Sequence, residues 1–174
     1  MEVTRLSINK ILNGLSKATT IISVLMMVLL SVTLFTGVIT RYVFSFSVPE
    51  LELFRDFALI WLVLLGSAIA VRDKQHLDID IFSEYLSERL NNIRLMIVYV
   101  LTLLGIVILL FIGFAAFKAG LNRLELVPIR FLSSQPSLIY YYSAFLIGSL
   151  MMLIFHLENM KDFFPKINNK DVNK

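Results

Sequence analysis

Four long runs of residues without a charged side chain constrain this chain more than any other feature. These runs cover residues 18–40, 57–71, 95–117 and 131–155. A helix rises about 1.5 Å per residue, so about 20 apolar residues cross a hydrocarbon core about 30 Å thick. Hydrophobic residues make up 57% of the 174 positions, which is more apolar surface than a soluble domain of this size can bury. The sequence therefore predicts an all-α membrane protein rather than a soluble globular enzyme.

The second run has only 15 residues and needs its N-terminal flank to cross the membrane. Pro49 suits the first turn of a helix, and Glu50 and Glu52 would then lie where the helix dipole favours negative charge. Pro136 begins the fourth helix by the same reasoning. We therefore expect one membrane domain over residues 1–174, with a polar tail at residues 165–174 and four transmembrane helices at residues 18–40, 49–71, 95–117 and 136–155.

The positions of lysine and arginine predict the orientation, because cytoplasmic connections carry an excess of them. With both termini in the cytoplasm, the inner side carries 11 basic residues and the outer side carries 5. We therefore expect a multi-pass protein with both termini cytoplasmic. The net charge of +3 follows from this topology and does not indicate nucleic-acid binding.

Two stretches outside the spans have an amphipathic pattern, residues 4–17 and 79–93. In the second stretch, apolar residues recur at steps of three and four, at Ile79, Phe82, Leu86, Leu90 and Ile93. Such segments form interfacial helices at the level of the lipid headgroups. They could equally extend the neighbouring spanning helices, and the sequence leaves both interpretations open.

Motifs for common chemistry are missing from the sequence. It contains no GxxxxGK[ST], GxGxxG, HExxH or GxSxG motif, and it has no cysteine for thiol catalysis or metal binding. The centres of the first, third and fourth spans carry no charge, although solute pathways normally need ionisable groups or broken helices at that depth. We therefore expect no enzymatic activity, no catalytic residue, no cofactor, and no solute pathway within this chain.

The segment His76-Leu77-Asp78-Ile79-Asp80 carries one histidine and two carboxylates, which could bind a divalent ion. An N-cap formed by Asp78 or Asp80 explains the carboxylates more simply, so we expect no metal site. Haem is also disfavoured, because His76 and His156 both lie at helix ends, whereas axial ligands usually lie deeper between helices.

Three charged residues near the outer end of the second helix are candidate contact residues. Glu52, Arg55 and Asp56 share one face by helical spacing, and such charges are costly when they face lipid. They could dock a partner, or they could form a solvated helix end with a local Glu52–Arg55 pair.

Residues further along the same helix leave similar alternatives. Trp61 could pack against lipid or the core, or contact a ligand. Gly66 and Ala70 form a small-xxx-small pair that permits close helix approach, within this chain or against a partner. Two further pairs of this kind are Ala116 with Gly120 and Ala144 with Gly148.

Residues 41–80 resemble the small membrane subunit of tripartite ATP-independent periplasmic (TRAP) transporters, the DctQ-like family. The resemblance rests on Arg41-Tyr42-Val43-Phe44, an acidic helix start, Trp61-Leu62-Val63-Leu64-Leu65-Gly66-Ser67-Ala68, and the following Arg72 and His76-Leu77-Asp78-Ile79-Asp80. The acidic segment departs from the family, which often has an aromatic residue before two adjacent acids, whereas this chain has Pro49-Glu50-Leu51-Glu52.

The resemblance implies a protein of the bacterial inner membrane that pairs with a large transport subunit. In such systems the large subunit carries the substrate and sodium sites. A soluble periplasmic substrate-binding protein delivers an organic acid, such as a dicarboxylate or a sialic acid. The small subunit would brace the large subunit and help dock the binding protein.

Together, the residue patterns and the resemblance predict two groups of contact residues. We expect partner contacts from Arg41, Glu50, Glu52, Arg55, Asp56, Trp61 and Gly66. On the inner side, we expect Arg72 and His76 to contact lipid headgroups or a partner. One rival function is a self-sufficient small exporter that works as a homodimer, in which Glu52 or Asp56 would have to supply the membrane-embedded carboxylate.

Overall fold

Four helices account for most of the chain. The computed structural model describes residues 2–73, 88–126 and 135–168. The helices are α1 (Glu2–Tyr42), α2 (Pro49–Arg72), α3 (Glu88–Leu121) and α4 (Ile139–Asn168). Each one is long and apolar enough to cross a membrane. The prediction of an all-α membrane protein with four transmembrane helices is therefore confirmed.

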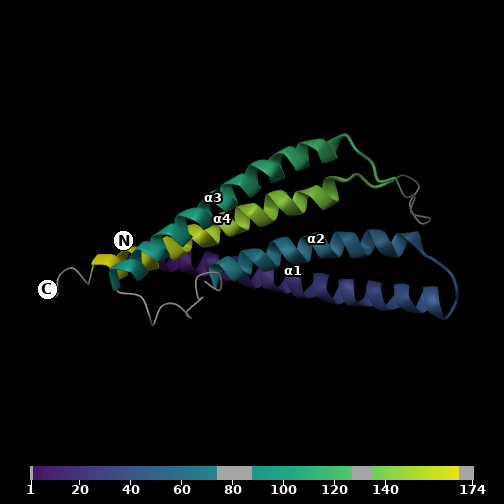
Figure 1. Cartoon of the computed structure of the whole chain (residues 1–174), viewed down its shortest axis with the longest axis horizontal. Helices are drawn as coiled ribbons and strands as arrows, with labels where there is room; N and C mark the ends of the chain where they lie inside the picture. Colours follow the sequence, from purple (N-terminus) through teal and green to yellow (C-terminus); the bar gives the residue numbers. More distant parts are fainter. Residues whose placement is uncertain (1, 74–87, 127–134, 169–174) are drawn as a thin grey trace.

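The helices form two antiparallel hairpins that pack side by side (Figure 1). Helix α1 packs mainly against α2, α2 also packs against α4, and α4 packs against α3. We call the end that carries both chain termini the termini end, and the opposite end, where α1 connects to α2 and α3 to α4, the loop end (Figure 1). The contacts thus follow the order α1, α2, α4, α3, with α2 and α4 as the two inner helices.

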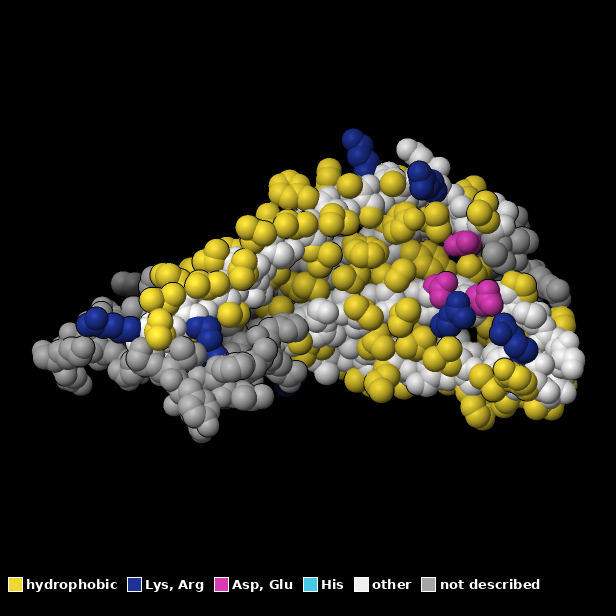
Figure 2. Space-filling view, viewed as in Figure 1, with side chains coloured by type: hydrophobic (Ala, Val, Ile, Leu, Met, Phe, Trp, Pro, Cys, Tyr) yellow, Lys and Arg dark blue, Asp and Glu magenta, His cyan; other side chains and the backbone are white. Residues whose placement is uncertain are grey.

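This order leaves the two outer helices largely uncovered. The Phe35 side chain on α1 is 69% exposed, and the Phe111 side chain on α3 is 74% exposed. Hydrophobic side chains cover the middle of the molecule, and charged side chains gather toward its ends (Figure 2). Lipid or a partner subunit must cover this apolar surface, because water cannot solvate it favourably.

The two amphipathic stretches do not form separate helices in the described part of the chain. Residues 4–17 belong to α1, which is continuous from Glu2 to Tyr42. Residues 88–93 belong to the start of α3, and residues 79–87 lie outside the described residues. For the first stretch, the structure therefore supports an extension of the spanning helix.

The starts of α2 and α4 differ in how well the sequence predicts them. Helix α2 begins at Pro49, with Glu50 and Glu52 in its first turn. Helix α4 begins at Ile139 rather than at Pro136. Pro136 lies instead in a short antiparallel pairing, in which its carbonyl accepts a 2.9 Å hydrogen bond from the backbone N–H of Glu125.

Ser137 explains why α4 starts where it does. Its hydroxyl donates a hydrogen bond to the Gly120 carbonyl at 2.9 Å and accepts one from the backbone N–H of Ile139 at 3.3 Å. A serine that satisfies an orphan N–H in this way stabilises the first turn of a helix. At the other end, α4 continues to Asn168, into the segment predicted as a polar tail.

The core lies where α2 and α4 meet. It includes Leu64 and Ala68 on α2, and Ala144 and Phe155 on α4. Gly148 allows the two backbones to approach, because a Cβ atom added to it would lie 2.7 Å from the Cβ atom of Leu64. The small pair Ala144–Gly148 therefore packs inside this chain.

Helix α1 contacts its neighbour through small hydroxyl side chains. Ser16, Thr19, Ser23 and Thr33 are its buried residues. The Thr19 and Ser23 hydroxyls donate hydrogen bonds to carbonyls four residues earlier, each at 2.9 Å. Their polar groups are thus satisfied within α1, and their small size permits close packing.

A polar cluster at the termini end connects three helices. Arg72 on α2 forms an ion pair with Glu158 on α4, with 3.4 Å between its Nε and the Glu158 Oε2, and donates a hydrogen bond to the Asn13 side chain on α1. The Asn159 amide donates a 2.7 Å hydrogen bond to the Val71 carbonyl near the end of α2. These contacts hold α1, α2 and α4 together and satisfy a carbonyl that the end of α2 leaves free.

Replacement of Gly148 by leucine should destabilise the chain, because the new side chain has no room against Leu64. We expect the free energy of unfolding to fall by about 1–3 kcal/mol. Unfolding in sodium dodecyl sulfate can be followed by the fluorescence of Trp61, the single tryptophan. The matched control is Gly105→Leu, since nothing lies within 4 Å of a Cβ atom there. Equal stability of the two variants would contradict the packing described.

Loss of the Asn159 amide should cost more than loss of the Glu158 charge. Asn159 is 9% exposed, and Asn159→Ala removes the amide donor of its buried hydrogen bond to the Val71 carbonyl, at a cost of about 1–3 kcal/mol. Glu158→Gln keeps the side-chain size and removes a partly exposed ion pair, which is worth about 0–1 kcal/mol. The same fluorescence titration compares the two variants. A larger loss for Glu158→Gln would show that the ion pair dominates.

Candidate functional site

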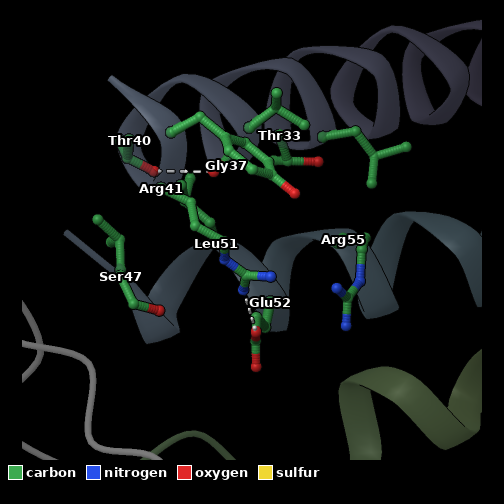
Figure 3. Close-up of a pocket in the computed structure, with 12 residues that line it drawn as sticks. Thr33, Gly37, Thr40, Arg41, Ser47, Leu51, Glu52 and Arg55 are labelled. Carbon is green, nitrogen blue, oxygen red and sulfur yellow. Dashed lines mark hydrogen bonds and ion pairs between the residues drawn. The ribbon is translucent and has the colours of Figure 1, made fainter. Parts of the chain in front are cut away.

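A pocket of about 240 Å³ lies between α1 and α2 at the loop end (Figure 3). Helix α1 supplies one wall and α2 the other, with two residues of the connecting turn between them. Its lining consists of Thr33, Leu34, Gly37, Val38, Thr40, Arg41, Tyr42, Ser47, Val48, Leu51, Glu52 and Arg55. The pocket therefore contains three of the residues for which the sequence predicts partner contacts.

The tight connection between the helices brings these residues together. The backbone N–H of Phe46 donates a 3.0 Å hydrogen bond to the Thr40 carbonyl. Ser45 adopts a left-handed conformation with φ of 51°. Few residues other than glycine adopt this conformation, and here it helps the chain to reverse direction between α1 and α2. The reversal places Arg41 of α1 opposite Glu52 of α2.

The charged side chains of this end pair differently from the sequence prediction. The Arg41 Nη2 lies 3.7 Å from the Glu52 Oε1, across the two helices (Figure 3). Arg55 pairs with its neighbour Asp56 at 3.0 Å rather than with Glu52. The Arg41 and Glu52 side chains are 64% and 54% exposed, so water screens their pair and it adds little stability. The local Glu52–Arg55 pair, one of the two alternatives that the sequence left open, is therefore replaced by an Arg41–Glu52 pair between the two helices.

Trp61 lies in the contact between α2 and α4. Its Nε1–H donates a 3.1 Å hydrogen bond to the Tyr140 carbonyl. Phe57 lies beside it, with 6.0 Å between the ring centroids, and also contacts Tyr141 edge-on at 5.7 Å. Tyr141 in turn donates a 3.1 Å hydrogen bond to the Leu53 carbonyl. The tryptophan thus helps to attach α4 to α2, which is an internal role that the sequence alone could not assign.

Gly66 belongs to an uncovered stripe that runs along α2. We call this stripe the open face of α2, and it consists of Glu52, Asp56, Leu59, Val63, Gly66 and Ala70. These residues recur at steps of three and four, and each is exposed or half-buried. Nothing in the described chain lies within 4 Å of a Cβ atom at Gly66, in contrast to Gly148. Within the described chain, Gly66 therefore leaves open space on this face of α2.

The inner-side candidates have different outcomes. Arg72 is committed to the polar cluster at the termini end, where its guanidinium also lies 5.6 Å from the centre of the Phe155 ring. His76, Asp78 and Asp80 lie outside the described residues. The sequence analysis did not identify Glu158 as a contact residue, although an acidic residue toward the C-terminal end of α4 is a natural partner for the basic C-terminal end of α2.

Residues of the types that bind metal ions are scattered rather than clustered in the described ranges. Residues 2–73, 88–126 and 135–168 contain no group of three or more histidine, cysteine, aspartate or glutamate residues that could hold a metal ion. His156 is buried, and its ring stacks on Tyr99 at 4.1 Å between centroids. The last charged candidate, Glu50, is half-buried in the first turn of α2.

Two comparisons with known proteins agree with this architecture. Residues 30–165 match the family described as "Tripartite ATP-independent periplasmic transporters, DctQ component". A Haemophilus influenzae protein named "Putative TRAP transporter small permease protein" is 25% identical over 156 residues, which cover 88% of this chain and 90% of that protein. The family match includes all of α2 and α3, most of α4, and the C-terminal part of α1 from residue 30 onward. Because it spans well over half of the sequence, this chain belongs to the DctQ family of tripartite ATP-independent periplasmic transporter components.

Proposed function

We propose that this chain is the non-catalytic small membrane subunit of a sodium-coupled transporter for organic acids of the dicarboxylate or sialic acid type. It braces the large transport subunit and helps to dock the periplasmic substrate-binding protein. Membership of the DctQ family and four membrane-spanning helices make it a multi-pass inner-membrane component of a TRAP transporter. The following observations support the finer role.

The main support for this proposal is the distribution of charged residues along the helices. Within the described helices, charged side chains lie toward the ends, and the long segments between them are continuous helix without a charge. The residues that bound these segments are Lys17 and Arg41 in α1, Asp56 and Arg72 in α2, Arg94 and Lys118 in α3, and Glu158 in α4. A polar solute needs ionisable groups or broken helices at mid-depth, so the cargo must cross through another subunit.

The packing supports a bracing role. Helices α2 and α4 are attached toward the loop end by the Tyr141–Leu53 hydrogen bond, near the middle of α2 by the Trp61–Tyr140 hydrogen bond, and at the termini end by the Arg72–Glu158 ion pair. Because α2 and α4 are attached along their length, they offer a fixed surface against which a mobile partner can move. On this surface, the open face of α2 includes Gly66, where a partner helix can approach closely.

The charged rim at the loop end supports a docking role. It consists of Arg41, Glu50, Glu52, Arg55 and Asp56. Three of these side chains, Arg41, Glu52 and Asp56, are more than half exposed. Exposed charges of both signs steer and orient a soluble partner more than they add affinity. The rim therefore suits contact with a binding protein that arrives from the periplasm.

Docking from the periplasm requires the loop end to face outward. The excess of 11 basic residues over 5 supports this orientation, with both termini in the cytoplasm. The rival role of a homodimeric exporter would need a carboxylate deep in the membrane. Glu52 and Asp56 instead lie in the first two turns of α2, and both side chains are 54% exposed.

Accessibility of introduced cysteines should reveal the proposed orientation. The chain has no natural cysteine, so a single substitution gives an unambiguous label. Leu126 is 89% exposed at the loop end, and Leu126→Cys should react with a membrane-impermeant maleimide in intact cells. Lys10→Cys, near the termini end, should react only after the membrane is permeabilised. The reverse pattern would overturn the orientation.

Reconstitution of the transporter tests the proposed function directly. Liposomes that contain the large subunit together with this chain should take up organic acid when the binding protein and a sodium gradient are supplied. Gly66→Leu should retain roughly tenfold less large subunit during co-purification and lower uptake accordingly, because close helix approach is lost.

The control for this experiment is Gly105→Leu, which places the same side chain in open space on α3. It should leave co-purification and uptake unchanged. Trp61 fluorescence and helical circular dichroism show whether each variant folds. Full uptake by the large subunit in the absence of this chain, or uptake by this chain alone, would refute the proposal.

A further inference from the structure

The loop-end pocket between α1 and α2 has the chemistry of a lipid site. We propose that it binds a phospholipid with an ethanolamine headgroup, with the phosphate beside Arg41, the ammonium group beside Glu52, and the start of an acyl chain along Gly37. This inference concerns this chain alone and does not depend on assembly with a large subunit. Four features of the pocket lead to it.

The first feature is the depth of the pocket in the membrane. The connection between α1 and α2 projects aromatic side chains outward, with Tyr42 79% exposed and Phe44 69% exposed. Exposed aromatic residues at the end of a spanning helix mark the membrane–water interface. The mouth of the pocket, formed in part by Tyr42 itself, therefore lies at the level of lipid phosphates.

The second feature is a change in polarity along the pocket. The lining passes from Arg41 and Thr40 at the mouth to Val38, Leu34 and Thr33 further along α1. Eight residues of helix correspond to about 12 Å. The Thr33 hydroxyl donates to the Leu29 carbonyl at 2.9 Å, so its hydrogen bond is made within α1. The pocket is thus polar where a headgroup would lie and apolar where an acyl chain would begin.

The third feature is the arrangement of charges. The Arg41–Glu52 ion pair joins only one nitrogen to one oxygen, at 3.7 Å, so most donors of the guanidinium and most lone pairs of the carboxylate face elsewhere (Figure 3). Arg55 is paired with Asp56 at 3.0 Å. Because Asp56 neutralises Arg55, Arg41 and Glu52 are the cation and the anion of the pocket lining that can meet a headgroup, which favours a zwitterionic headgroup over an anionic one. An ethanolamine headgroup offers a phosphate to Arg41 and N–H donors to Glu52.

The fourth feature is the open space at Gly37. Nothing lies within 4 Å of a Cβ atom at this position, although the residue lines the pocket. The missing side chain leaves room on the α1 wall, and a larger residue there would fill the groove without a clash inside the chain. Gly37 is thus a position where the site can be blocked without disturbing the fold.

The experiment uses the full-length purified chain, stripped of lipid in detergent, and measures lipid binding by native mass spectrometry. The probes are palmitoyl-oleoyl phosphatidylethanolamine, phosphatidylcholine and phosphatidylglycerol. We expect phosphatidylethanolamine to bind about tenfold more tightly than the other two, because only its headgroup satisfies both side chains. Gly37→Leu should weaken its binding about tenfold, whereas Gly105→Leu should leave it unchanged.

Two further substitutions assign the partners of the headgroup. Glu52→Gln should abolish the preference for phosphatidylethanolamine over phosphatidylglycerol, since it removes the acceptor for the ammonium group. Arg41→Gln should weaken binding of all three lipids. Lys10→Gln, which removes a charge near the termini end and outside the pocket lining, is the control and should leave both affinity and preference unchanged.

Several outcomes would overturn the proposal. Equal binding of the three lipids, stronger binding of phosphatidylglycerol, or an unchanged affinity in a folded Gly37→Leu variant would each do so. If Gly37→Leu does not fold, as judged by Trp61 fluorescence, the lipid binding of the Arg41→Gln and Glu52→Gln variants tests the proposal. Unchanged affinity and preference in these two variants would then overturn it. Since no large subunit is present, a negative result here leaves the proposed transporter role intact.

Discussion

The contact between α2 and α4 holds the two hairpins together, and the remaining architecture depends on it. Gly148 lets the backbones approach at Leu64, the Trp61–Tyr140 hydrogen bond connects them near the middle of α2, and Arg72 pairs with Glu158 at the termini end. In a bilayer, apolar burial does not favour helix contact over lipid contact, so close packing and hydrogen bonds must provide the association. These three contacts supply close packing and polar bonds at different points along the two helices.

The contact order α1, α2, α4, α3 follows from this central contact, and it determines which helix surfaces remain uncovered. Because α2 and α4 pack against each other, α1 and α3 each have one main neighbour and expose most of their apolar side chains. The open face of α2 stays uncovered between its two neighbours, with small residues toward one end and carboxylates at the other. Exposed apolar surface of this extent is typical of a protein that contacts lipid or another subunit.

The charged residues have different roles at the two ends of the molecule. At the termini end they stabilise the fold, since Arg72 joins α1, α2 and α4 in a partly buried cluster. At the loop end they pair weakly across exposed surface, as in Arg41–Glu52, and so remain available to other molecules. Between the two ends, the spanning segments of the described helices carry no charge.

The four spanning helices, the start of α2 at Pro49 and the family resemblance around Trp61, Gly66 and Arg72 could all be predicted from the amino-acid sequence. Charge-free length, helix-start residues and ordered spacing are local properties of the chain. In contrast, the internal packing of Gly148, the open space at Gly66, the contact between Arg41 and Glu52, and the start of α4 at Ile139 became known only from the folded arrangement of the helices. The physical reason is that lipid tails are as apolar as leucine, so hydropathy cannot distinguish a helix face that meets lipid from one that meets another helix.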